Sequence, residues 1–410
     1  MEEYETAPLL WIDATRPASG WQLWGMTLVE RQLRQARLEG VVRAVVAVVA
    51  ETRGAATAWR SDLSRIYDIT VEIVEISSGQ TSLASLCRLD AKSILAIEGD
   101  VLYDDRILNL LFAGGDDEMV GDEQGAAARL SADSVRRLDP QAPSLASACA
   151  AVLPSVPVSQ LDTYVADLRL TMAPIRVRLT ERSQLREVDH LLYHRTFKGV
   201  IDIVASHGYY RLVRGITRWL SRTSLTPNFF TVISILGIWI AVPCFTVGSL
   251  WAGVIAAWIG VIFDSVDGKL ARLTLQLSDT MGTVEHLTAV PGLGLWFVAL
   301  GWHFSGGEIL DLTRTPALAC WVLVLCFVMD KMLSGLFKFI VGSELFDFAC
   351  IDALFHGIAA RRNIHLLMLT VGVTLSLAEQ AYVAMAIAMV LTMLFHTVRV
   401  GWILAVSHRP

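Results

Sequence analysis

The sequence is short of charge. Asp, Glu, Lys and Arg make up 18% of its 410 residues, whereas hydrophobic residues make up 54%. Soluble globular chains carry about 25% charged residues, so an entirely soluble protein is excluded. Most of the charge lies in 1–224, where the pattern is mixed α/β, and 225–410 is a series of apolar runs with short polar breaks. The composition therefore predicts two domains, one soluble and one embedded in a membrane.

Three further absences narrow the class of protein. The first thirty residues show no basic stretch followed by an apolar core, so we expect no secretory signal and a cytosolic N-terminal domain. The six cysteines show no CxxC or Cys/His metal spacing and are interpreted as buried free thiols. A net charge of −6 without a dominant basic block argues against nucleic acid as a main partner. We find no collagen, heptad or solenoid repeat.

The second half of the sequence contains long hydrophobic segments. A helix needs about 20 apolar residues to cross the core of a bilayer. Six segments approach that length and predict six transmembrane helices, at 228–248, 249–271, 283–304, 315–341, 363–379 and 381–406.

Basic residues predict how these helices are oriented. Lys and Arg prefer the cytoplasmic side of a membrane. They precede the first span and recur in alternate loops, so we expect both termini and the loop after the second span to face the cytosol, in a cell or inner membrane. The residues are Arg211, Arg214, Arg218, Arg222, Lys269, Arg272, Lys338, Arg361 and Arg362.

The second span ends in an acidic motif, FDSVDGKLAR. On a helix, Asp264, Asp267, Gly268 and Ala271 stand at i, i+3, i+4 and i+7, which is one stripe. Carboxylates suit a hard divalent cation, which usually shares its remaining positions with phosphates. Small residues let a bulky ligand approach the backbone. The stripe indicates a platform for a metal and a pyrophosphate at the cytosolic edge of the membrane.

A plainer interpretation of the same residues stays open. Asp264 and Asp267 could pair with Lys269 and Arg272 at a helix end, since ion pairs of this kind are common next to membranes.

The motif also carries a resemblance. DSVDGKLAR resembles the DxxDGxxAR signature of the CDP-alcohol phosphotransferases, membrane enzymes with six transmembrane helices. TPNFFT at 226–231 is similar to their Pro-Asn-x-x-Thr start of the first helix, and RRNIHLL at 361–367 precedes the fifth. The resemblance covers about 195–405. It implies that an acceptor hydroxyl attacks the phosphorus of a CDP-alcohol, that CMP leaves, and that Mg²⁺ or Mn²⁺ is needed.

The resemblance assigns roles to residues and partners. It implies a lipid-bilayer enzyme with a CDP-alcohol donor, a hydroxyl or phosphorylated polyol or lipid acceptor, and a homodimer as a possibility. It implies that the metal is bound by Asp264, Asp267 and Glu285. The nucleotide would contact Gly268, Ala271 and Arg272, in a pocket bordered by Thr226, Pro227 and Asn228. A phosphate on the acceptor would be bound by Arg361 and Arg362.

The chain departs from the signature at one acid. Counted from Arg272, the family's third acid falls on Glu285 and its fourth, the general base, falls on Ala289. If one residue is inserted, Gly282 supplies the family's glycine and the two acid positions fall on His286 and Val290, so either register loses the fourth carboxylate. Loss of a positioned base costs about 10²–10⁴-fold in rate. His286 is a substitute base, although a lone histidine in an apolar helix is more often a packing residue. We therefore expect catalysis by Glu285 or His286, with weakened turnover.

Charged residues elsewhere in the membrane half have several interpretations. Lys198 and the arginines before the first span predict an amphipathic helix at the membrane surface, within a linker at 191–225 between domains at 1–190 and 226–410. Asp330 and Lys331, inside the fourth span, are either partners of each other or line a cavity.

The first domain shows the pattern of an α/β sandwich. Buried parallel strands are predicted at 41–50, 70–76 and 93–100, with helices between them. Asp100 follows the last of these strands, at the edge where open α/β sheets bind ligands.

This half resembles the sugar-nucleotide and inositol-phosphate nucleotidyltransferases, a Rossmann-like fold. IEGDVLYDDRILNLL is similar to their strand-end Gly-Asp, whose Asp holds Mg²⁺. The order of the domains resembles the bifunctional inositol-1-phosphate cytidylyltransferase/di-myo-inositol-phosphate-phosphate synthase family. The phosphate loop, however, offers one glycine, Gly20, before Gly25, and VRLTERSQL at 177–185 has no acid at the point where the family has the late Asp that supplies a second metal ligand. We expect this domain to be inactive, with Asp100 a relic, a weak binding residue or a turn former.

Three functions remain. The leading one is a membrane transferase that moves a phospho-alcohol group from a CDP-alcohol to a hydroxyl, in phospholipid or polyol-phosphodiester synthesis. The second is a pseudoenzyme that binds CDP-alcohol or acts as a scaffold, as two eroded motifs suggest. The third is a six-helix transporter, which is disfavoured because the acids cluster at one end rather than at the midplane of the membrane.

Overall fold

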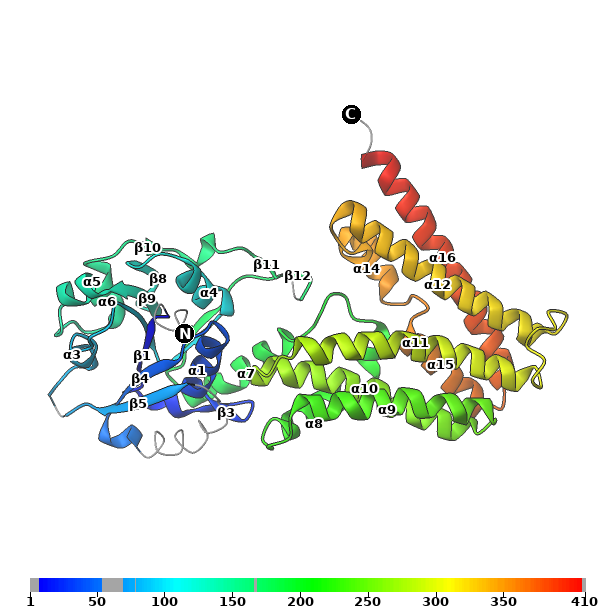
Figure 1. The fold of residues 1–410 in the computed structure, drawn as a ribbon, viewed down its shortest axis with the longest axis horizontal. Helices are drawn as coiled ribbons and strands as arrows, with labels where there is room; N and C mark the ends of the chain where they lie inside the picture. Colours follow the sequence, from blue (N-terminus) through cyan, green and yellow to red (C-terminus); the bar gives the residue numbers. More distant parts are fainter. Residues whose placement is uncertain (1–6, 54–68, 78, 166–167, 408–410) are drawn as a thin grey trace. The chain divides into compact units, whose positions relative to one another are not determined.

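The computed structural model describes residues 7–53, 69–77, 79–165 and 168–407 (Figure 1). The chain divides into two compact units. Unit 1 comprises Met1–Val165 and Thr171–His194, and unit 2 comprises Ala166–Leu170 and Arg195–Pro410. Each unit is described by itself.

Unit 1 is built on a seven-stranded sheet, which confirms the predicted α/β class. The strand order is β10-β8-β9-β6-β1-β4-β5, with β1 parallel to β4 and β6, β4 parallel to β5, and β9 antiparallel to β6 and β8. The strands are β1 (Leu9–Asp13), β4 (Arg43–Val48), β5 (Thr70–Glu75), β6 (Ser93–Glu98), β8 (Glu118–Asp122), β9 (Gly125–Ser131) and β10 (Ser155–Val156).

The interior strand β1, like β8, β9 and β10, is not among the strands predicted from the sequence. Leu10 and Ile12 pack into the core on one face of the sheet, and Leu9 and Trp11 pack into the core on the other. A strand buried on both faces is a continuous apolar run without alternation. The five residues LLWID show that run, but it is too short to separate a strand from a loop by periodicity alone.

Helices and short strands complete unit 1. The β1–α1 connection contains a short 3-10 helix, η2 (Pro17–Gly20), and the hairpin of β2 (Gln22–Leu23) and β3 (Met26–Thr27). Thr27 caps α1 by accepting the Glu30 N–H, as Ser, Thr and Asp side chains commonly do at helix starts. The helices are α1 (Leu28–Leu38), α3 (Ser82–Leu86), α4 (Asp105–Ala113), α5 (Ala132–Arg137), α6 (Leu145–Ala150) and α7 (Leu185–His194), and the remaining strands are β7 (Val101–Tyr103), β11 (Tyr164–Val165), β12 (Leu170–Thr171) and β13 (Arg176–Arg178).

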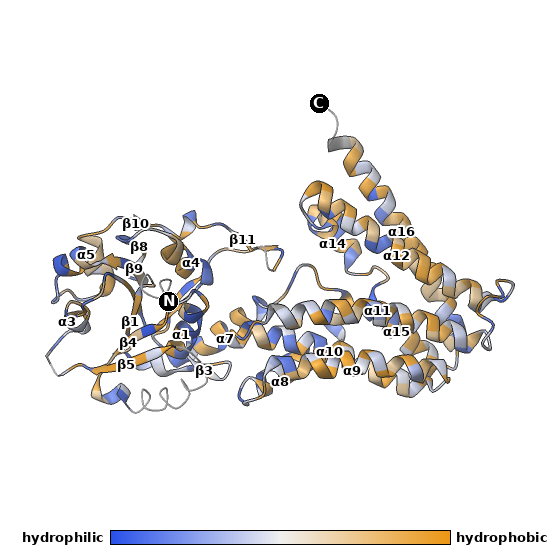
Figure 2. Ribbon diagram, viewed as in Figure 1, coloured by the Kyte–Doolittle hydropathy of each residue, from blue (hydrophilic) through white to orange (hydrophobic). Residues whose placement is uncertain are grey.

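Unit 2 is helical, and its long helices are predominantly apolar (Figure 2). A π-helical turn, η6 (Val204–Gly208), precedes them. The helices are α8 (Tyr210–Leu220), α9 (Pro227–Thr246), α10 (Leu250–Thr274), α11 (Asp279–Phe304), α12 (Thr315–Val341), α13 (Leu345–Phe348), α14 (Cys350–His356), α15 (Arg362–Thr374) and α16 (Ala378–Ser407).

Five of the six predicted spans are confirmed as candidate membrane helices. Within the described residues, α9, α10, α11, α12 and α16 are long and apolar enough to cross a membrane. The predicted span at 363–379 is shorter than expected. Its helix, α15, has 13 residues, which is about 20 Å of helix against a bilayer core of about 30 Å. The chain turns at 375–377, where Ser376 adopts a positive φ of 58°, before α16 begins.

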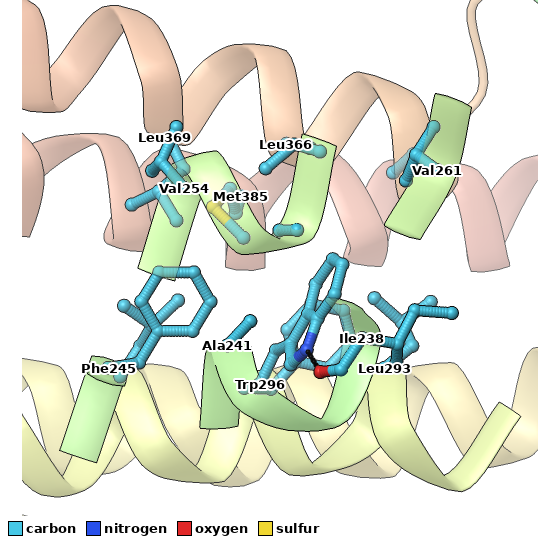
Figure 3. Packing of buried hydrophobic residues seen from close by; sticks show 14 of the residues in the cluster. Ile238, Ala241, Phe245, Val254, Val261, Leu293, Trp296, Leu366, Leu369 and Met385 are labelled. Carbon is cyan, nitrogen blue, oxygen red and sulfur yellow. Dashed lines mark hydrogen bonds between the residues drawn. The ribbon is translucent and has the colours of Figure 1, made fainter. Parts of the chain in front are cut away.

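Close packing fixes the helices that carry the acidic motif. A Cβ on Gly237 of α9 would lie 2.6 Å from the Gly260 backbone nitrogen of α10, so this helix crossing requires a glycine. Ser234 donates to the Gly260 carbonyl at 2.9 Å. Trp296 of α11 donates its indole N–H to the Ile238 carbonyl of α9 at 2.7 Å (Figure 3). The core that Figure 3 shows also includes residues of α15 and α16, so one packed core positions α9, α10, α11 and α15.

The cysteine prediction holds in part. All six cysteines are free, and Cys149, Cys320 and Cys326 are buried. Cys350, at the start of α14, is exposed, so burial was wrong for this thiol.

Candidate active site

Asp267 is the most constrained acid of the motif. It lies in the last two turns of α10 and is 3% exposed. Its Oδ1 accepts the Gly268 N–H at 2.5 Å. Its Oδ2 is buried and has no hydrogen-bond partner among the described residues. Because burying an unpartnered polar atom costs free energy, this oxygen favours a further ligand, and the Thr231 hydroxyl is the protein side chain that interacts with the same carboxyl group.

Asp264 stands one turn earlier and has a protein partner. Its Oδ2 accepts from Nη2 of Arg362, the first residue of α15. Glu285 of α11 lies beside Asp264 and within electrostatic range of Asp267. Three helices therefore bring three carboxyl groups and one guanidinium together. Carboxylates this close repel each other unless a proton or a cation lies between them.

These acids fit a hard divalent cation by their chemistry, although they do not yet form a complete cage. In the described part of the chain, no three or more His, Cys, Asp or Glu side chains are arranged as a ready metal centre. Asp264 is turned toward Arg362 instead. The unpartnered Asp267 oxygen and the oxygen-only donors are what Mg²⁺ or Mn²⁺ requires.

The basic residues of the motif have partners of their own. Arg272 donates Nε–H to the Thr196 carbonyl at 2.8 Å, and Lys269 lies 4.5 Å from the centre of the Phe197 ring. Neither is within ion-pair distance of Asp264, so simple pairing at the helix end does not explain that acid. A Cβ on Gly268 would lie 3.2 Å from Nη2 of Arg272, so the glycine keeps space open beside this guanidinium.

In unit 1, two of the acids at the strand ends form ion pairs with arginines. Asp100 Oδ2 accepts from Nη1 of Arg16 at 2.9 Å and from Nη1 of Arg178 at 3.0 Å. Glu98 Oε2 accepts from Nη2 of Arg178 at 2.5 Å. Asp13, at the end of β1, accepts from Ser82 and Thr15.

A metal ion does not fit at Asp100, because two guanidinium groups already occupy its carboxylate. Arg178 reaches it from β13, which pairs antiparallel with β7 so that Arg178 faces Val101. The segment in which the sequence showed no second metal ligand thus supplies a cation in place of an acid.

Comparison with known proteins agrees with the geometry of unit 2. Residues 224–398 match the family model described as CDP-alcohol phosphatidyltransferase. Over these residues, the helical half is similar to the CDP-alcohol phosphatidyltransferases. A stretch of 76 residues is 37% identical to phosphatidylinositol phosphate synthases of Mycobacterium bovis and Mycobacterium tuberculosis, covering 18% of this chain. The chain matches only about a third, 34%, of the length of these relatives.

Two solved structures are similar to parts of this chain. The phosphatidylinositol phosphate synthase of Mycobacterium tuberculosis with CDP-DAG bound is 20% identical, with a TM-score of 0.36, and the match covers 46% of this chain and 94% of that one. The inositol-1-phosphate CTP transferase from T. maritima is 12% identical, with a TM-score of 0.34, and the match covers 46% and 96%.

The start of the region that matches the family model adjoins the acids. Thr226 caps α9, Pro227 is its first residue, and Asn228 is exposed. Thr231, one turn later, lies beside Asp267. His286 belongs to α11, but its side chain lies outside the described part of the structure, so its predicted role as a base stays a prediction.

A buried polar network beside the site was missed by the sequence reasoning. Asn363 donates Nδ2–H to Asp202 Oδ2 at 2.7 Å and to the Tyr209 hydroxyl at 2.9 Å. The Tyr209 hydroxyl in turn accepts from Ser265, next to Asp264, at 3.5 Å. The network ties the start of α15 to α10 and so positions Arg362. The only local signal was that Asn363 follows the two arginines, since nothing in the spacing marks Asp202.

Further cations surround the first turn of α15. Among the described residues, the Arg361 guanidinium forms no ion pair within 4.0 Å, and its strongest electrostatic neighbour is Asp202, followed by Arg362 and more weakly Asp330. Asp330 contacts Nδ1 of His396 at 2.5 Å, so it does not pair with Lys331 as one interpretation had it.

His356 adds no charge to this group. Burial, reinforced by the positive charge of Arg361, lowers the pKa of His356 to about 3. It is therefore neutral at neutral pH, and the arginines carry the positive charge available to an anion.

Proposed function

We propose that this protein is a membrane transferase that moves a phospho-alcohol group from a CDP-alcohol to a hydroxyl acceptor and releases CMP. The observation that carries the proposal is the unpartnered oxygen of Asp267, in the family motif, beside Asp264 and Glu285. The proposal is further supported by five candidate membrane helices in the same half of the chain.

The chemistry requires an attack at phosphorus. The acceptor oxygen forms a bond to the phosphorus that bears the donor alcohol, and the bond from that phosphorus to the CMP oxygen breaks. Asp264, Asp267 and Glu285 would hold Mg²⁺ or Mn²⁺, which supplies positive charge to the pyrophosphate and the leaving CMP. Glu285 would take the acceptor proton, with His286 as the alternative base. The open space at Gly268 would receive the nucleotide, next to Ala271 and Arg272.

The acceptor is proposed to carry a phosphate. Arg361 and Arg362 stand together at the N-terminus of α15, and guanidinium groups bind phosphate oxygens in a bidentate way. The curated relatives are named phosphatidylinositol phosphate synthase, which makes an inositol phosphate the first acceptor to test and a CDP-linked diacylglycerol the first donor. A homodimer stays a prediction.

The site is proposed to face the cytosol. On α8, Leu212 and Trp219 are 51% and 66% exposed and alternate with Arg211, Arg214 and Arg218. Apolar and basic residues on one short helix are typical of a helix lying at an anionic membrane surface. Because basic residues prefer the cytoplasmic side, α8 and the adjoining acidic motif would lie there.

Release of labelled CMP tests the proposal. The purified full-length chain in detergent is given Mg²⁺, a CDP-alcohol, and either an inositol phosphate or the unphosphorylated polyol. We expect CMP release that depends on metal and acceptor, and its loss in Asp267→Ala. Glu308→Gln, in an exposed ion pair with Arg314, is the control that should retain activity.

The alternatives predict different results. Saturable, metal-dependent CDP binding without CMP release from any donor and acceptor would indicate the pseudoenzyme. Nucleotide behaviour that Asp267→Ala leaves unchanged would contradict the proposal and favour a transporter.

A further inference from the structure

Asp264 and Arg362 form a pair between a proposed metal ligand and a proposed phosphate ligand. Their side chains are 16% and 23% exposed, and the two residues are 98 positions apart in the chain. Asp267, one turn along the same helix, has an oxygen with no hydrogen-bond partner in the part of the chain that the structure describes. The structure thus shows one acid open and the other neutralised by an internal cation.

A divalent cation and Arg362 cannot both use Asp264 fully. A metal ion needs the carboxylate oxygens as ligands, and Oδ2 of Asp264 accepts a hydrogen bond from the guanidinium. Once the carboxylate turns to a metal, Arg362 loses its counter-charge. Glu285, the other acid at this point, belongs to the same proposed ligand set.

A guanidinium released in this way needs another anion. Leaving one member of a buried ion pair without its partner is strongly destabilising. Arg361 stands next to it without an ion pair among the described residues, so two guanidinium groups would then be available. Their fork-shaped donors match the oxygens of a phosphate monoester.

The exchange would need movement of the Asp264 and Arg362 side chains but not of the backbone. Asn363, the next residue, is 8% exposed and donates to Asp202 and Tyr209, so the backbone at the start of α15 is held in place. Arg362 has a long side chain that can reach a new partner while its backbone stays fixed.

We propose that Arg362 couples the binding of the divalent cation to the binding of the acceptor phosphate. It neutralises Asp264 until a cation takes that carboxylate, and it then binds the phosphate monoester. The inference rests on the proposed function, because it takes Asp264 as a metal ligand. By thermodynamic reciprocity, each ligand must strengthen the binding of the other by the same factor.

Titration with Mn²⁺, followed by electron paramagnetic resonance, measures this coupling without turnover. The full chain is placed in discs of uncharged lipid, with or without inorganic phosphate. We expect phosphate to tighten Mn²⁺ binding by about 5–150-fold, the usual range of such couplings. In Arg362→Gln, Mn²⁺ should bind more tightly than in the wild type without phosphate, since no guanidinium competes, and phosphate should no longer change the affinity.

Further variants separate local effects from general ones. Arg362→Lys keeps the charge and should retain part of the coupling, even if the Gln variant folds poorly. Arg314→Gln, which removes an exposed arginine paired with Glu308 and Asp311, should behave as the wild type. Discs with an anionic phospholipid but no soluble phosphate show whether a lipid headgroup is the source of the anion, and tighter Mn²⁺ binding there that needs Arg362 also supports the coupling.

Two results would overturn the inference. One is weaker Mn²⁺ binding in Arg362→Gln than in the wild type, which would show that the arginine stabilises the metal site rather than competing with the metal. The other is an effect of phosphate that persists in Arg362→Gln, or no effect of either anion in the wild type. Failure of the proposed function has a different signature, because Mn²⁺ binding would then survive in Asp267→Asn.

Discussion

The two acidic sites of this chain differ in how many internal cations they contain. In unit 1, Asp100 accepts from Arg16 and Arg178, and Glu98 also accepts from Arg178. In unit 2, a single arginine reaches Asp264, and Asp267 keeps an oxygen without a partner. The comparison teaches that buried acids alone do not indicate a ligand site. What distinguishes an open site from a closed one is whether the fold already supplies the neutralising charge.

We expect the largest difference in transferase activity between variants of Asp267 and variants of Asp100. Asp267→Asn removes a charged oxygen from the proposed metal ligands while it keeps an acceptor for the Gly268 N–H. We expect CMP release to fall by about 10³-fold, as when a preorganised electrostatic group is removed from a catalytic site. Asp100→Asn should leave CMP release unchanged, because Asp100 serves only unit 1. A large loss of transferase activity in Asp100→Asn would end the distinction between the two sites.

A second, smaller difference in reaction rate is expected between variants of Glu285 and His286, both in the open site. If Glu285 takes the acceptor proton, Glu285→Gln should lower the rate by about 10²-fold, the low end of what a general base contributes. His286→Ala should then change the rate little. Single-turnover measurement of CMP formation at several pH values checks this, and a larger loss in His286→Ala would move the base to the histidine.

The closed site should respond in stability rather than activity. Arg178→Ala removes the ion pair at 2.5 Å from Glu98 and one of two ion pairs from Asp100, and these two acids are 1% and 2% exposed. We expect unit 1 to lose about 3–5 kcal/mol of unfolding free energy, the usual cost of breaking a buried ion pair. Hydrogen exchange of the β6 amides in the full chain measures it. Arg136→Ala, which breaks the exposed pair with Asp133, should cost less than about 1 kcal/mol.

Local patterns predicted a good part of this architecture. Five spans followed from uninterrupted apolar runs, and the strands at 70–76 and 93–100 followed from short β-branched runs next to turn residues. The acidic stripe at the end of α10 followed from helical spacing alone. In each case the signal lies within one element, so its period or length is visible in the sequence.

The pairs that decide between an open and a closed site were not predictable in the same way. Arg362 meets Asp264 across 98 residues, and Arg178 meets Asp100 across 78. No local period encodes such contacts, because they depend on how α15 packs on α10 and on how β13 pairs with β7. The resemblance to a family pointed to Arg362 as a phosphate ligand, and only the fold shows that it also neutralises an acid.

The smallest expected effect concerns metal binding in unit 1, and it tests most directly whether the two acidic sites differ. In a full-length Asp264→Asn/Asp267→Asn variant the open site is disabled, so any remaining specific metal binding must come from elsewhere. Because Arg16 and Arg178 already neutralise Asp100, we expect excess Mn²⁺ to leave hydrogen exchange of β6 unchanged. Adding Arg178→Ala removes the short ion pair of Glu98 and one of the two arginines that bind Asp100, and Mn²⁺ should then restore part of the lost protection. The opposite result would be that Mn²⁺ slows hydrogen exchange of β6 while Arg178 is present, and that Asp100→Asn abolishes this effect. It would show that unit 1 has a working metal site and that a metal displaces its arginines, as is proposed for Arg362.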